Sequence, residues 1–198
     1  MRQEFQPKEI DIFKGIIGLI KQGKPPYALT AAEIAAAAGI GKGTLYEYFS
    51  SKDESIEKAV LYHIYESIEG VLRALETRKG FREKYYVLME LIEKNVASVP
   101  YFDLLNSVMQ RHMKTVMCDK ETLAELRSIA SGVIRKLVEA GKEEGLFRAG
   151  GDTAYVYVAI YSALTGYTLL LLDKTATEMT DTDLLKEQSY TMLERALK

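Results

Sequence analysis

The sequence predicts an all-α protein of about nine helices, in which a small N-terminal three-helix module precedes a larger helical body. Three observations predict this fold class. Apolar residues recur at helical spacing through most of the 198 residues, alternating apolar patterns are almost absent, and only four prolines interrupt the chain. With 47% hydrophobic and 27% charged residues, the chain has enough apolar material for a sizeable core.

The first fifty residues contain short predicted helices. The first covers residues 8–22 and ends before two consecutive prolines. Thr30 followed by Glu33 has the pattern of a capping box, so a second helix is expected to begin there and to end at Gly39. A third short helix is expected over residues 42–49, three residues after that glycine.

The predicted helices that follow are longer. Ser51 and Glu54 form a second capping-box pattern, which opens a long helix that Gly80 ends. Five further helices are predicted around residues 81–96, 101–116, 126–140, 152–173 and 181–196. The change from short to long helices predicts an N-terminal domain of residues 1–50 and a second domain of residues 51–198.

Two short helices joined by a few residues that include glycine are typical of a helix-turn-helix. Leu45 and Phe49, one turn apart, are expected to face inward, and Gly39 provides the sharp turn. Residues 42–44, Tyr46 and Tyr48 are left on the outer face. Their cation, hydroxyls and exposed backbone are groups that hydrogen-bond phosphates and reach base edges.

The run from Leu29 to Ala35, followed by Ala38 to Phe49 and Ser51 to Glu54, resembles the DNA-binding region of TetR-family regulators. The resemblance implies that a homodimer binds double-stranded operator DNA and that a small molecule in the C-terminal body releases it. It implies phosphate contacts from one set of residues and contacts near base edges from another. The first set is Thr30, Tyr46, Tyr48 and Lys52, and the second is Lys42, Gly43 and Thr44. Gly41 stands where serine is more common, so a weaker cap is expected there.

We therefore expect a sequence-specific DNA-binding transcriptional regulator, and specifically a cytoplasmic repressor that a small-molecule effector releases from its operator. The net charge of −2 does not by itself indicate nucleic acid, but the charge of the contact face is what matters. No enzyme activity and no cofactor are expected. The alternative is a small all-helical enzyme or ligand carrier with an incidental helix-turn-helix.

The segment from Ala154 to Leu172 has no charged residue and nearly the length that spans a bilayer. Its tyrosines, its small polar residues and its lack of a basic flank favour a buried helix instead. Small residues along one face let another helix approach, so this helix and the last one are expected to form the dimer interface. The expected interface residues are Val156, Ala159, Ala163, Gly166, Leu170 and Leu193. Packing of the same face within one subunit is the alternative.

A loose set of aromatic residues, methionines and one histidine is the candidate effector site, and it favours an apolar or aromatic effector. The set is Phe102, Met109, His112, Met113, Met117, Tyr157 and Tyr161. Taken singly, residues of these types more often fill a core than contact a ligand. No metal site is expected, because two histidines and one cysteine provide no ligand cluster at zinc spacing. Residues 39–44 resemble a phosphate loop only superficially, since no strand precedes them.

Overall fold

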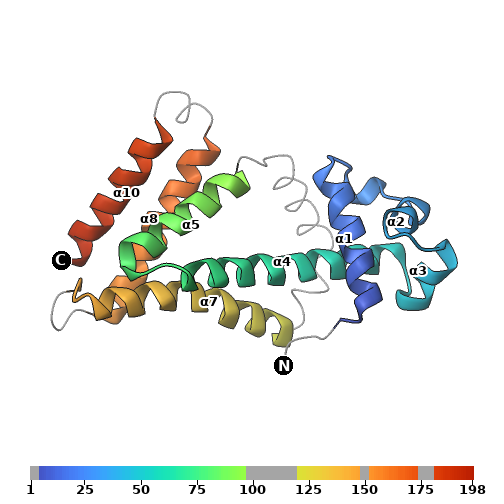
Figure 1. Cartoon of the computed structure of the whole chain (residues 1–198), viewed down its shortest axis with the longest axis horizontal. Coiled ribbons are helices and arrows are strands. Elements are labelled where there is room, and N and C mark those ends of the chain that lie inside the picture. The colour runs from blue at the N-terminus through green and yellow to red at the C-terminus, as the bar shows by residue number, and fades with distance from the viewer. Residues whose placement is uncertain (1–4, 97–119, 148–151, 174–180) are drawn as a thin grey trace. The chain divides into compact units, whose positions relative to one another are not determined.

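The computed structural model describes residues 5–96, 120–147, 152–173 and 181–198, and within these ranges every regular element is a helix (Figure 1). The predicted all-α class is therefore confirmed. The α-helices are α1 (Pro7–Lys21), α2 (Ala31–Ala37), α3 (Lys42–Tyr48), α4 (Lys52–Glu76), α5 (Gly80–Val96), α7 (Lys120–Glu143), α8 (Thr153–Leu172) and α10 (Thr182–Leu197). A short 3₁₀ turn, η1 (Pro26–Ala28), lies between α1 and α2. The helix predicted around residues 101–116 lies outside the described residues.

The described chain forms two compact units, each with its own hydrophobic core. The first unit contains residues 5–68 and 120–128, and the second contains the remaining described residues. Helix α4 contributes to both units, because its residues 52–68 belong to the first and 69–76 to the second. The predicted domain boundary after residue 50 stays a prediction.

The core of the first unit is built around the ring of Phe13 in α1, which is fully buried. The centroid of this ring lies 5.1 Å from that of Phe5, 5.8 Å from that of Phe49 and 5.5 Å from that of Tyr62. Aromatic rings bury large apolar areas and gain further from such offset or edge contacts. Phe13 therefore joins α1 to the end of α3 and to α4.

In the second unit, α8 packs against α5 and α10 (Figure 1). The four buried residues of α8 recur at helical spacing, which places them on one side of the helix. They are Val156, Ile160, Ala163 and Tyr167. A buried cation accompanies this apolar contact. Lys186 Nζ of α10 lies 3.0 Å from Glu93 Oε1, and the same oxygen accepts a hydrogen bond from the hydroxyl of Tyr167. These contacts offset the cost of burying the charge.

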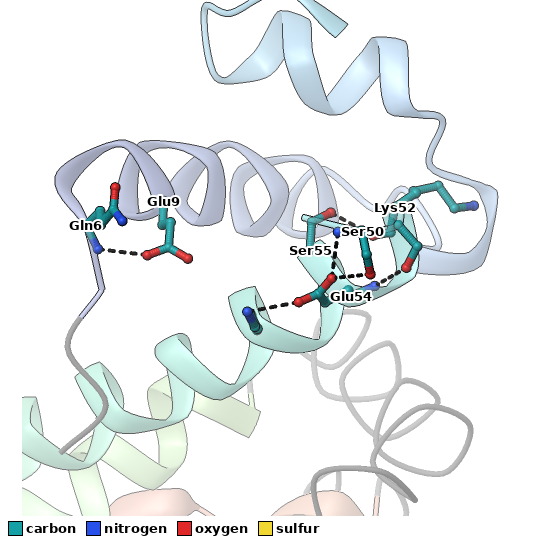
Figure 2. Close-up of polar contacts among 8 residues, drawn as sticks. Gln6, Glu9, Ser50, Lys52, Glu54 and Ser55 are labelled. Atoms are coloured by element: carbon teal, nitrogen blue, oxygen red, sulfur yellow. Dashed lines mark hydrogen bonds and ion pairs between the residues drawn. The ribbon is translucent and has the colours of Figure 1, made fainter. Parts of the chain in front are cut away.

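The first predicted capping box is confirmed. The amide of Glu33 donates to Thr30 Oγ1 at 3.2 Å, and the amide of Thr30 donates to Glu33 Oε2 at 2.9 Å. Each side chain thus satisfies a backbone donor of the other, which fixes the start of α2. The sequence did not predict the similar box at the start of α1, where the amide of Gln6 donates to Glu9 at 2.8 Å (Figure 2).

The second predicted capping box is only half right. The amide of Glu54 does donate to Ser51 Oγ, at 3.0 Å. The return bond goes to a different residue, because the amide and the hydroxyl of Ser50 both donate to Glu54 Oε2, at 2.7 and 2.6 Å (Figure 2). Two adjacent serines offer competing donors, and the carboxylate takes both donors of Ser50 instead of the amide of Ser51.

Acid is expected to destabilise the protein through Glu54. Hydrogen bonds from Ser50, followed by those from Lys58, lower the pKa of the Glu54 carboxyl from 4.5 to about 2. Because the folded-state pKa is the lower one, this stabilisation is complete above about pH 4.5 and is lost as the pH falls towards 2. Urea-unfolding midpoints measured through this window should fall less for Glu54→Gln than for the wild type. A pH profile in Glu54→Gln equal to that of the wild type would contradict the assignment. Asp11→Asn, at an exposed position of α1 in the same unit, is the control and should follow the wild-type profile.

Candidate nucleic-acid interface

Helices α2 and α3 form the predicted helix-turn-helix. Helix α2 ends at Ala37, and the chain leaves it through Gly39, whose φ of 66° lies in the left-handed region that favours glycine. The amide of Ile40 then donates to the carbonyl of Ala35 at 2.9 Å, which turns the chain toward α3. Leu45 and Phe49 are 0% and 2% exposed, so the predicted inward pair is confirmed and α3 is held against the core by these two side chains.

The outer face of α3 presents a mixed set of groups. Lys42, Gly43 and Tyr46 are exposed, whereas Thr44 and Tyr48 are half-buried, and Tyr48 packs against the core of the first unit. Gly41, which precedes the helix, makes no side-chain capping bond, as the sequence predicted. The DNA-contacting roles of these residues stay predictions.

Helix α3 exposes one further side chain that was not among the predicted DNA contacts, Glu47. A glutamate on a helix that enters the major groove accepts a hydrogen bond from the amino group of cytosine. Its position between the two tyrosines of the motif was the available signal. Glu47 therefore joins the candidate base-reading residues of this face.

Two predicted phosphate contacts, Thr30 and Lys52, lie beside the motif and already have partners. The hydroxyl of Thr30 donates to Glu33 Oε2 at 2.9 Å, so both of its proton donors serve the cap of α2. Lys52 Nζ lies 3.5 Å from the carbonyl oxygen of Tyr27 and 3.8 Å from Asp53 Oδ1. In Figure 2 the side chain of Lys52 extends away from the hydrogen bonds that link Ser50 to Glu54.

The predicted effector site has two of its seven residues in the described part of the chain. Phe102, Met109, His112, Met113 and Met117 lie outside the described residues. The other two members are on α8, where Tyr157 packs beside the core of the second unit and Tyr161 is 47% exposed. Within the described ranges, no group of three or more His, Cys, Asp or Glu side chains could hold a metal ion. Effector binding stays a prediction.

The residues of the expected dimer interface have very different exposures in the chain itself. Val156, Ala163 and Leu193 are buried in the core of the second unit, whereas Gly166 and Leu170 are exposed. The remaining one, Ala159, is partly buried against that core.

A larger set of exposed apolar side chains lies on the same two helices, and we call it the outer apolar face. It consists of Tyr155, Val158, Tyr161, Leu169, Leu170 and Leu172 on α8, with Leu184 and Met192 on α10. By length and composition, α8 is also the one described helix apolar enough to cross a membrane. A core helix of a soluble protein meets the same criterion, so one such helix is weak evidence for a membrane span. The helix predicted to be buried is thus buried along one side and exposed along the other.

Comparison with known proteins agrees with the helix-turn-helix and with the all-helical fold described above. Residues 22–54 match the model of the family described as bacterial regulatory proteins, tetR family. No curated protein matches the sequence. A TetR-family protein from Vibrio parahaemolyticus is 21% identical, with a TM-score of 0.67 over 96% of this chain and 98% of that chain. The transcriptional regulator FadR from Bacillus subtilis, solved in complex with stearoyl-CoA, is 17% identical, with a TM-score of 0.57 over 95% of this chain and 97% of that chain.

The fold by itself does not determine function. A structure described as superantigen PfiT is 20% identical to this chain, with a TM-score of 0.65 over 99% of both chains. The helix-turn-helix and the family model that matches it are therefore what carry the functional class. Together with the fold, they make this chain similar to TetR-family DNA-binding transcriptional regulators, in agreement with the resemblance found in the sequence. The likeness extends to the family and to no single member.

Proposed function

We propose that this protein is a cytoplasmic repressor that binds a palindromic operator as a homodimer and leaves it when a small-molecule effector binds. The observation that carries the proposal is the α2–α3 pair, in which the buried side chains of Leu45 and Phe49 hold α3 against the core while Lys42 and Tyr46 are exposed. A helix held in this way can enter the major groove, with its outward groups against bases and phosphates.

The outer apolar face supports the homodimer. A helix that is apolar on all sides is stable in water only when each side is covered, and the described residues cover one side of α8. A second copy that presents the same face is the simplest cover, since two-fold interfaces are self-complementary. We place the interface on the exposed residues, such as Val158, Leu169 and Met192, because Val156, Ala163 and Leu193 already fill the core of their own subunit.

Helix α4 supports the proposed coupling between effector and DNA, because it contributes to both compact units. The two recognition helices of a dimer must lie about one DNA turn apart, roughly 34–36 Å, to enter successive major grooves. An effector that binds better to a dimer with a different separation shifts the population away from DNA. The stearoyl-CoA complex of FadR makes long-chain acyl-CoA thioesters the first effectors to test, in line with the apolar effector expected from the sequence.

The proposal is tested by selecting bound duplexes from a random DNA pool with the full chain and then adding stearoyl-CoA and shorter acyl-CoA thioesters. Enrichment of a palindrome, followed by its release by one of these compounds, is the expected result. A pool that shows no enriched sequence would refute sequence-specific binding and favour the alternative of a helical enzyme or carrier. Enrichment with no release by any thioester would refute this effector class alone.

Two substitutions are expected to separate the roles of the proposed contacts. Lys52→Ala should weaken binding to every duplex alike, because a lysine on a phosphate carries no sequence information. Thr44→Ala should instead alter the preference at one base position, by about 1–3 kcal/mol. Affinities for a set of duplexes with single base changes provide the measurement. The assignment fails if both variants lose the same affinity on every duplex.

A further inference from the structure

Tyr27 is an exposed aromatic residue in the η1 turn that precedes α2. Tyr27 is 58% exposed. Among the large apolar residues in the described part of the first unit, only Tyr46 of α3, at 47%, is also classed as exposed. Single exposed aromatic residues are common on protein surfaces, so exposure alone assigns no role. Three further features distinguish Tyr27.

The first feature is the rigid turn that presents it. Pro25 and Pro26 fix two successive backbone angles, and the amides of Ala28 and Leu29 donate to their carbonyls at 2.9 and 3.2 Å. Pro26 and Leu29, on either side of the Tyr27–Ala28 pair, are buried in the first unit. An exposed side chain on such a turn loses little backbone freedom when it binds a partner.

The second feature is a direct link to a proposed phosphate contact. Lys52 Nζ donates to the carbonyl oxygen of Tyr27 at 3.5 Å, which joins η1 to the first turn of α4. Tyr27 therefore lies next to the residue whose charge is proposed to hold the DNA backbone. A duplex that reaches Lys52 passes close to this turn.

The third feature is the scarcity of positive charge. Residues 22–54 contain three lysines and no arginine against four carboxylates, and one of these lysines, Lys24, is paired with Glu33 at 2.8 Å. Lysine charge alone therefore provides few phosphate contacts in this segment. Neutral donors, among them the hydroxyl of tyrosine, commonly hydrogen-bond phosphate oxygens and replace part of that missing contribution.

We propose that Tyr27 is a further DNA-contacting residue, whose hydroxyl donates to a backbone phosphate beside the one held by Lys52. The proposal rests on the DNA-binding function proposed above. A neutral donor displaces no counterion, so Tyr27 adds affinity for every sequence and leaves the salt dependence unchanged. A lysine contact affects both quantities.

The test compares Tyr27→Phe, Tyr27→Ala and Lys52→Ala with the wild type, on the selected operator and on a scrambled duplex of equal length, over a series of salt concentrations. Tyr27→Phe should weaken binding of the dimer to both duplexes by about tenfold, with an unchanged salt slope. The salt slope is the slope of log K against log salt concentration. Lys52→Ala should make it less steep by about 2, since each of the two half-sites loses one phosphate contact. Tyr86→Phe is the matched control, because it removes a hydroxyl that donates to Glu187 in the second unit. This variant should bind DNA like the wild type.

The possible failures are distinguishable. A wild type that binds neither duplex refutes the proposed function itself. A wild type that binds the operator, with both Tyr27 variants folded by circular dichroism and equal to it in affinity, overturns the role of Tyr27 alone. A loss in Tyr27→Ala without one in Tyr27→Phe, or a changed salt slope in Tyr27→Phe, also overturns the phosphate contact.

Discussion

Leu169→Glu is expected to convert the proposed homodimer into monomers and to abolish tight binding to the operator. Leu169 is 62% exposed on α8 and belongs to the outer apolar face on which we place the interface. In a two-fold interface the substitution introduces two carboxylates, and each unpaired buried charge costs about 3–5 kcal/mol. A monomer also engages one half-site in place of two, so the affinity should fall more than about 100-fold. Sedimentation equilibrium and gel-shift titration measure the two effects.

Ala130→Glu is the matched control for this prediction. Ala130 is an exposed residue of α7 and does not belong to the outer apolar face. Glutamate is a good helix former, so it should be tolerated at this position. This variant should remain a dimer with wild-type affinity for the operator. A Leu169→Glu protein that stays dimeric would place the interface on another surface.

Phe13→Ala is expected to produce the largest loss of stability, about 3–5 kcal/mol. The ring is fully buried, and its removal leaves a cavity among Phe5, Phe49 and Tyr62. Because Phe49 follows α3 directly, loss of this support should also disorder the recognition helix and weaken DNA binding. Urea unfolding followed by circular dichroism measures the stability.

Tyr46→Ala separates stability from function in the same unit. Tyr46 is 47% exposed, so its removal should leave the free energy of unfolding nearly unchanged while it weakens DNA binding. The opposite pattern, a stable Phe13→Ala protein and an unfolded Tyr46→Ala protein, would contradict the described packing of α1 and α3. Equal losses of stability in both variants would contradict it as well.

The elements that the sequence predicted correctly are those determined by local chemistry. The capping pair of Thr30 and Glu33, the turn at Gly39 and the inward pair of Leu45 and Phe49 each depend on neighbours within a few residues. Spacing is then sufficient to predict the structure. The same reasoning went partly wrong at Glu54, because adjacent serines offered two equivalent local solutions.

The orientation of α8 could not be predicted in this way. In an amphipathic helix the charged residues lie opposite the buried side, so the sequence predicts which side is buried. Helix α8 has no charged residue between Ala154 and Leu172, so this prediction is not possible there. The small residues Val156 and Ala163 were expected at the dimer interface, but they pack in the core of their own subunit. Only the tertiary contacts with α5 and α10 distinguish the two sides. Tyr27 was missed for a related reason, since its link to Lys52 joins residues 25 positions apart.

The glycine at position 43 implies a trade-off between stability and function in the recognition helix. A Cβ atom added to Gly43 would meet no described atom within 4 Å, so packing in the free protein does not require glycine there. Gly43 is the second residue of α3, and glycine is less favourable than alanine in a helix, by up to about 1 kcal/mol in the helix interior. A sequence optimised for folding alone would therefore carry alanine at this position. In the DNA complex proposed above, the seven-residue helix α3 would give up intrinsic stability for a backbone that the duplex can approach closely.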